Sequence, residues 1–209
     1  IASFFFILVT YYLILFISSH MQKVIILSGP SGVGKNTLGD FLLLQFPQLS
    51  YSVSATTREI RKGEKDGVDY HFMNREAFEE KMHNDELLEW QEVYAGTYYG
   101  TLKSELERIN QLNKFPLLVV DVFGAINVMK NLKFKPLSLF IQPKSLAVLR
   151  QRLESRGTDS PEKIEKRLAK AEIEMEEFNQ FDITIINDDL HIAQQQLAII
   201  VDHFLTREN

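Results

Sequence analysis

The sequence predicts an α/β fold in which helices cover both faces of a central parallel sheet. Continuous apolar runs recur at residues 23–28, 117–120, 137–141 and 183–186, and segments with helical spacing of apolar residues separate them. Such runs are typical of parallel strands buried on both faces, and strands that alternate with helices favour this kind of sheet. The chain has 209 residues, of which 45% are hydrophobic and 24% charged, and this suits one domain with a sizeable core.

A glycine-rich turn after the first apolar run also supports this fold class. Gly29-x-x-x-x-Gly34-Lys35 has the spacing of a phosphate-binding loop and stands between a predicted strand and a predicted helix. Its glycines let backbone N–H groups turn toward an anion, and the helix directs its N-terminal dipole at the same place. A plain strand–turn–helix is the alternative. The residues of the predicted phosphate site are Gly29, Pro30, Ser31, Gly32, Val33, Gly34, Lys35, Asn36 and Thr37.

The position after the lysine departs from the usual pattern. Ser or Thr normally stands there to bind magnesium, whereas this chain has Asn36 followed by Thr37. The Asn36 oxygen or the Thr37 hydroxyl is the predicted metal contact.

Composition limits the possible partners. The formal net charge is −5, which gives no indication of nucleic acid or an acidic membrane as a partner. There are no cysteines, so disulfides, thiolate chemistry and cysteine-based zinc sites are excluded. We expect a cytoplasmic protein.

Residues 1–20 contain no Lys, Arg, Asp or Glu and are long enough to span a bilayer. However, no basic region precedes them, and Met21 stands directly before the first predicted strand. One interpretation is upstream sequence read in frame with a true start at Met21; the other is a membrane anchor. We therefore expect a hydrophobic leader over 1–20 and a single domain over 21–209.

The remaining elements follow from apolar spacing, caps and breakers. Asn74 is a predicted N-cap, and Ser160 with Pro161 begins another helix. The predicted helices are 35–46, 75–83, 103–111, 124–130, 145–156, 161–178 and 192–204. The other predicted strands are 51–55, 70–73 and 87–94, with a polar segment at 56–67 and a turn at 96–100.

Several motifs in a fixed order carry a resemblance to a known family. They are Ser54-x-Thr56-Thr57-Arg58-x-x-Arg61-x-Gly63-Glu64-x-x-Gly67-x-Asp69-Tyr70-x-Phe72, then Glu89, Tyr98-Tyr99-Gly100-Thr101, Arg156-Gly157-Thr158 and Asn187-Asp188-Asp189. From about Val24 to Leu190 the chain resembles the guanylate kinases. The resemblance implies transfer of the terminal phosphoryl group of ATP to GMP, with magnesium.

It also implies a P-loop NTPase-type three-layer fold with a central parallel sheet, a small mixed GMP-binding subdomain and a helical lid. The corresponding ranges are a core at 21–53, 103–142 and 171–209, a GMP-binding region at 54–102 and a lid at 143–170.

On the acceptor side, Arg58 and Arg61 are expected to hold a phosphate through paired N–H donors. Glu89 is expected to accept from the N1–H and N2–H₂ groups of guanine, a pairing that adenine lacks. By resemblance, Tyr70 and Tyr98 contact the GMP phosphate, and Ser54, Thr101 and Asp121 line the base pocket. The alternatives are a solvated charged loop for the arginines, core packing for the tyrosines and a surface carboxylate for Glu89.

On the donor side, the resemblance places Arg152, Arg156 and Arg167 in the lid over ATP and Asn187 near the adenine. Lys35, Arg58, Arg156 and Arg167 are the predicted catalytic residues, since phosphoryl transfer requires positive charge around the migrating group. Asp121 is predicted to meet a magnesium water shell. The family usually has an acid at the position of Val119 and Gln at that of Phe123, which puts this metal contact in doubt.

Two other functions stay open from the sequence. One is a non-catalytic guanylate-kinase-like binding module, against which the intact Gly29, Gly34 and Lys35 argue. The other is a related kinase with a different acceptor, against which the set of Ser54, Arg58, Arg61 and Glu89 argues. The expected partners are ATP and GMP. A membrane is expected only if residues 1–20 belong to the protein, and the oligomeric state is open.

Overall fold

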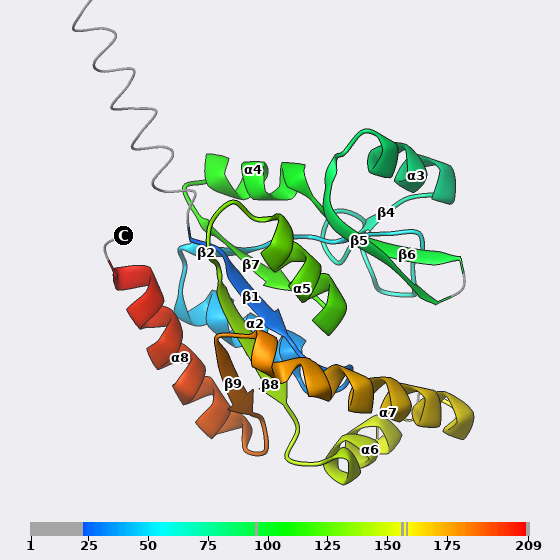
Figure 1. Ribbon diagram of the computed structural model, residues 1–209, viewed down its shortest axis with the longest axis vertical. Helices are drawn as coiled ribbons and strands as arrows, with labels where there is room; N and C mark the ends of the chain where they lie inside the picture. The colour runs from blue at the N-terminus through cyan, green and yellow to red at the C-terminus, as the bar shows by residue number, and fades with distance from the viewer. Residues whose placement is uncertain (1–22, 95, 156, 158, 208–209) are drawn as a thin grey trace, which may run out of the picture.

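A computed structural model describes residues 23–207 except 95, 156 and 158. Its central sheet has five parallel strands in the order β2-β7-β1-β8-β9 (Figure 1). The strands are β1 (Ile25–Ser28), β2 (Leu49–Tyr51), β7 (Phe115–Val119), β8 (Leu137–Gln142) and β9 (Ile183–Ile186). The parallel sheet predicted from the continuous apolar runs is confirmed.

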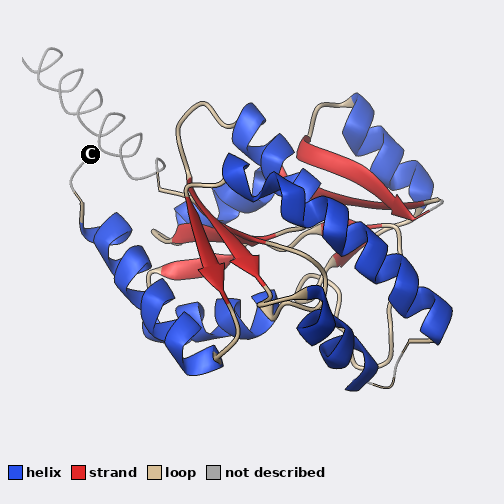
Figure 2. Cartoon of the chain, turned by 60° about the horizontal axis from the view of Figure 1, so that its bottom comes forward, coloured by secondary structure: helices blue, strands red, loops and turns tan. Residues whose placement is uncertain are grey.

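Helices cover both faces of this sheet, as Figure 2 shows. Ile25 and Leu27 of β1 pack in one core cluster with residues of α2 (Lys35–Gln45) and α8 (Leu190–Thr206). Ile26, between them, belongs to a second cluster with α5 (Val122–Asn131). Successive side chains of a strand point to opposite faces, so one apolar run supplies both cores.

A second, mixed sheet of four strands in the order β4-β3-β6-β5 lies beside the first. Its strands are β3 (Ala55–Thr56), β4 (His71–Phe72), β5 (Leu87–Tyr94) and β6 (Thr97–Leu102). The helix α3 (Arg75–His83) packs on it through the fully buried Phe78, and the Asn74 side chain caps α3 as predicted. α4 (Lys103–Gln111) leads back to the central sheet, also as predicted.

Two predictions about this region are wrong. The strand predicted at 51–55 is two strands, because β2 pairs with β7 in the central sheet whereas β3 pairs with β4 and β6 in the small one. The turn predicted at 96–100 is most of β6, which pairs antiparallel with β5 over its length. Gly96, with φ of 79°, reverses the chain, and the residues after it are extended.

The helices α6 (Leu146–Ser155) and α7 (Pro161–Glu176) pack against each other at one end of the molecule. Ser160 caps α7 by accepting from the Lys163 N–H, as predicted. The helix ends two residues before the predicted boundary and continues as a 3₁₀ turn over Glu177–Gln180.

In the part of the chain that the structure describes, no helix combines the length and the apolar character needed to cross a bilayer. The predictions for residues 1–20 lie outside the described residues.

Candidate active site

The loop after β1 is shaped to surround an anion. Gly29, Gly32 and Gly34 all have positive φ, at 138°, 98° and 97°. Gly34 is the N-cap of α2 and no side chain caps that helix, so its first N–H groups are available to a ligand. Lys35 folds over the loop and donates to the carbonyl oxygens of Gly29 at 2.5 Å and Pro30 at 3.2 Å.

Asn187, the residue after β9, holds the phosphate loop in place. Its Nδ2 donates to the Val33 carbonyl at 2.7 Å, and the side chain is buried. A Cβ on Gly34 would lie 2.7 Å from the same Nδ2, so the loop and the amide fit closely. Arg152 of α6 donates to the Asn187 carbonyl at 2.7 Å, which ties α6 to the same point. The structure therefore places Asn187 and Arg152 against the phosphate loop and its support.

Glu89 is a buried carboxylate on β5, with only 7% of the residue exposed. The Thr101 hydroxyl, directly opposite on β6, donates to its Oε1 at 2.8 Å. Burial raises the pKa of Glu89 to about 7; the Thr101 hydrogen bond lowers it and the charge of Asp121 raises it further. The alternative of a surface carboxylate is therefore wrong.

Three side chains converge on the N-terminus of α5. A Cβ on Gly124 would lie 3.0 Å from Oδ1 of Asp121, 3.3 Å from Oε2 of Glu89 and 3.4 Å from Nε2 of Gln91. The structure thus brings the predicted Glu89, Thr101 and Asp121 together and adds Gln91. Sequence reasoning missed Gln91, although its place two residues after Glu89 on one strand was a signal.

Arg58 forms a bidentate ion pair with a carboxylate of the same chain. Its Nη1 and Nη2 donate to the two carboxylate oxygens of Glu64 at 3.0 and 2.8 Å, and Nη1 also donates to the Glu59 carbonyl. The guanidinium lies over the rings of Tyr70 and Phe72, 5.2 and 5.5 Å from their centroids. The Glu64 hydrogen bonds raise the pKa of Arg58 above its usual range. The geometry is that of a bidentate site for a planar anion or a phosphate.

The two neighbouring tyrosines of β6 face opposite ways, because adjacent residues of a strand do. Tyr98 packs in the small-sheet core, and its hydroxyl accepts from Arg75 at 3.1 Å. The Tyr99 ring lies 5.9 Å from that of Tyr70, and Tyr99 also raises the pKa of Arg58. Tyr99, rather than the predicted Tyr98, accompanies Arg58. The turn predicted at 96–100 concealed the strand alternation that distinguishes them.

Ser54 and Arg61, which were also predicted to bind the acceptor, lie close to Arg58 in the chain. Ser54 directly precedes β3, and its carbonyl accepts from His71. The Arg61 backbone N–H donates to Glu64 at 2.8 Å, and Arg61 is exposed.

Of the predicted lid arginines, Arg156 lies outside the described residues. Arg167 of α7 forms an ion pair with Asp159, whose carboxylate also pairs with Lys163 at 2.5 Å. Within the described part of the chain, the Arg167 Nε is buried and has no hydrogen-bond partner. Arg167, two turns into α7, is therefore paired with Asp159 just before the helix, and its Nε–H donor is unused.

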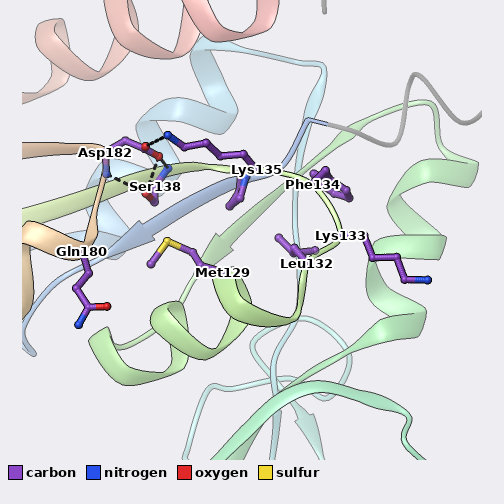
Figure 3. A pocket seen from close by; sticks show the side chains of 9 residues that line it. Met129, Leu132, Lys133, Phe134, Lys135, Ser138, Gln180 and Asp182 are labelled. Atoms are coloured by element: carbon purple, nitrogen blue, oxygen red, sulfur yellow. Dashed lines mark hydrogen bonds and ion pairs between the residues drawn. The ribbon is translucent and has the colours of Figure 1, made fainter.

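A hollow of about 460 Å³ opens near the start of β8 and is shown in Figure 3. Lys135 pairs there with Asp182 at 2.6 Å. Ile25 pairs with Leu137 in parallel register, so this hollow lies at the amino ends of the strands, whereas the phosphate loop follows the carboxyl end of β1. Ligands of parallel α/β sheets bind at the carboxyl ends, and the hollow is not part of the site. Its lining residues are Met129, Leu132, Lys133, Phe134, Lys135, Pro136, Ser138, Gln180 and Asp182.

A family model described as "Guanylate kinase" matches residues 21–204. The chain belongs to the guanylate kinase family. A guanylate kinase of Bacteroides thetaiotaomicron is 45% identical over 186 residues, which cover 89% of this chain and 91% of that protein. One of Salinibacter ruber is 40% identical, over 88% of this chain and 98% of its own length.

The fold agrees with this membership. The crystal structure of guanylate kinase from Anaplasma phagocytophilum is similar with a TM-score of 0.68 and 32% identity, over 88% of this chain and 86% of that one. The family resemblance and the P-loop NTPase-type α/β fold with a central parallel sheet, both expected from the motifs, are confirmed.

Proposed function

We propose that this protein is an ATP:GMP phosphotransferase that converts ATP and GMP, or dGMP, into ADP and GDP. Its membership of the guanylate kinase family supports the reaction class. The observation that carries the choice of acceptor is the buried Glu89 carboxylate, held by Thr101 and facing the N-terminus of α5. An intact phosphate loop favours this enzyme over a non-catalytic binding module.

Glu89 selects guanine by hydrogen-bond complementarity. Guanine presents the N1–H and N2–H₂ donors side by side, and a carboxylate accepts both. Adenine presents a lone pair at N1 and nothing at C2, so a buried carboxylate would face an acceptor and stay unpaired. Sites of this kind discriminate strongly because the wrong ligand leaves a buried polar group unsatisfied.

The acceptor phosphate binds at Arg58 in our proposal. Glu64 now holds the positions that two phosphate oxygens would take, and an arriving phosphate displaces it. Tyr70, Tyr99 and Arg61 surround the same place. An acceptor phosphate oxygen is already anionic near neutral pH, so the reaction needs no general base.

The donor phosphates bind to the N–H groups of the loop between Gly29 and Thr37, with Lys35 over the outer ones. An oxygen of the GMP phosphate forms a bond to the γ-phosphorus, the bond from that phosphorus to the β–γ bridging oxygen breaks, and ADP leaves. Arg156 and Arg167 add positive charge that stabilises the transition state. Lid helices over the site exclude water, which would otherwise hydrolyse ATP.

Magnesium, when bound with ATP, supplies charge that neutralises the phosphate oxygens. Asn36 and Thr37 are exposed oxygen donors in the first turn of α2, and such donors suit an ion that phosphates and water mainly hold. Asp121 fits less directly, because Oδ1 accepts from Gly124 N–H and Oδ2 lies against Lys170. Among the described residues, no group of three or more His, Asp or Glu side chains is placed to hold a metal.

The test is an ADP-release assay with ATP and either GMP or AMP. We expect turnover with GMP and little with AMP, and a fall of about a hundredfold or more in Lys35→Ala and Arg58→Ala. Lys130→Ala, an exposed change on α5, is the control and should match the parent protein. Equal rates with GMP and AMP, or near-normal rates in both variants, would contradict the proposal.

A further inference from the structure

Lys170 of α7 contacts two carboxylates and has no role in the proposed reaction. Its Nζ lies 3.3 Å from Oδ2 of Asp121, at the start of α5, and 3.4 Å from Oε1 of Glu174, one turn further along α7. The lysine is partly buried, with 35% of its side chain exposed, and Glu174 is almost fully buried at 2%. One ammonium group therefore joins two helices through two carboxylates.

The ion pair between Lys170 and Glu174 is largely buried, unlike a surface ion pair. Exposed pairs contribute little to stability, but a buried carboxylate needs a cation nearby. Burial raises the pKa of Glu174, and the charges of Lys170 and Lys35 oppose that rise. Both lysines therefore stabilise the charged form of the buried Glu174 carboxylate, and Lys170 does so by direct contact.

Asp121 is the point at which Lys170 reaches the acceptor pocket. Its other oxygen accepts from Gly124 N–H at 2.8 Å and caps α5. Asp121 and Glu89 both border the space beside Gly124. Two carboxylates so close repel each other, and a cation on Asp121 reduces that repulsion.

We propose that Lys170 is a positioning residue for the acceptor nucleotide: it holds and neutralises Asp121, so that Asp121 and Glu89 together present a fixed pair of carboxylates to the purine. This rests on the proposed function, because the purine pocket is the one assigned there to GMP. Lys170 acts through Asp121 and not on the phosphates. It also links the acceptor pocket to α7, the helix that carries Arg167 one turn earlier.

The first experiment measures GMP affinity by calorimetry, without ATP and with EDTA, so that neither donor nor metal contributes. We expect Lys170→Met to weaken GMP binding about tenfold, because it removes one close ion pair with Asp121. Lys170→Arg keeps the positive charge and should retain most of the GMP affinity. Lys166→Met, an exposed lysine on the same helix, is the matched control and should bind like the parent protein. The Michaelis constant for ATP should stay unchanged in Lys170→Arg and Lys166→Met, because both keep a cation beside the buried Glu174.

A double-mutant cycle tests whether the effect passes through Asp121. We expect Lys170→Met combined with Asp121→Asn to bind GMP no more weakly than Asp121→Asn alone. Additive losses would overturn the proposal, because they would mean that Lys170 acts by another route. Unchanged GMP affinity in Lys170→Met would overturn it as well.

A Lys170→Gln variant and the turnover of the parent protein distinguish failure of the Lys170 proposal from failure of the proposed function. Lys170→Gln removes the charge but keeps a donor for the buried Glu174, and it replaces Lys170→Met if thermal melting shows that the methionine variant is unfolded. A parent protein without ATP:GMP turnover contradicts the proposed function. A parent protein that turns over normally, beside a Lys170→Gln variant of equal GMP affinity, overturns only the role of Lys170.

Discussion

The Thr101 hydroxyl donates to Oε1 of Glu89 at 2.8 Å, from the residue directly opposite it in the small sheet. This bond fixes the carboxylate and leaves Oε2 directed at the start of α5. A buried carboxylate held in this way is costly for the fold and useful for recognition. Replacing Glu89 should therefore change base recognition and stability in opposite directions.

Glu89→Gln should abolish the preference for GMP over AMP. The amide replaces one acceptor oxygen by a donor, so guanine meets a donor where it needs an acceptor. We expect kcat/KM for GMP to fall about a hundredfold or more while that for AMP changes little. Steady-state assays with each monophosphate measure this, and Glu92→Gln on the exposed side of the same strand is the control. A variant that still prefers GMP would remove Glu89 from base recognition.

The same substitution should stabilise the protein at alkaline pH. The folded protein raises the pKa of Glu89 from 4.5 to about 7, chiefly by burial. A carboxyl group with a raised pKa favours the protonated folded state, so its contribution is fully present below pH 4.5 and is lost as the pH rises through 7. The loss amounts to about 3 kcal/mol. Urea unfolding of parent and Glu89→Gln proteins at pH 5 and pH 8 should show a stability difference that grows in favour of the variant; a constant difference would argue against it.

Tyr99→Phe and Tyr98→Phe form a matched pair that separates the site from the core. Tyr99 lies beside Arg58 and Tyr70, so loss of its hydroxyl should raise KM for GMP several-fold without changing stability. Tyr98 bonds to Arg75 away from the site, so its variant should lose about 1 kcal/mol of stability and keep KM. Kinetics and thermal unfolding of both variants are the measurements. The reverse pattern would place Tyr98, and not Tyr99, at the acceptor phosphate.

Asn187→Ala should loosen the phosphate loop. The change leaves the buried Val33 carbonyl without its donor, at a cost of about 1–3 kcal/mol. We expect lower thermal stability and a higher KM for ATP, with KM for GMP largely unchanged. Asp188→Asn is the control, because it disturbs only the exposed pair with Lys144. A stable variant with normal KM for ATP would show that the loop holds its shape unaided.

Local signals explain why much of the fold was predictable. Asn74 and Ser160 cap the helices that their types and positions indicated. Helices at Arg75–His83 and Lys103–Gln111, and strands at Leu87–Tyr94 and Ile183–Ile186, have the predicted bounds. Their apolar spacing is itself the packing pattern. The split of 51–55 between two sheets was not predictable in this way, because strand partners lie far along the chain.

The phosphate loop, the parallel sheet and the order of the family motifs were all predictable without the fold, since glycine backbone freedom, apolar periodicity and spacing are local properties of the chain. Three contacts became visible once the chain was folded: Tyr99 and not Tyr98 lies beside Arg58, Asn187 donates to Val33 across 154 residues, and Lys170 reaches Asp121 across 49. Those contacts depend on which strand faces and helices the fold brings together, and contacts between distant residues leave no periodic trace in the sequence.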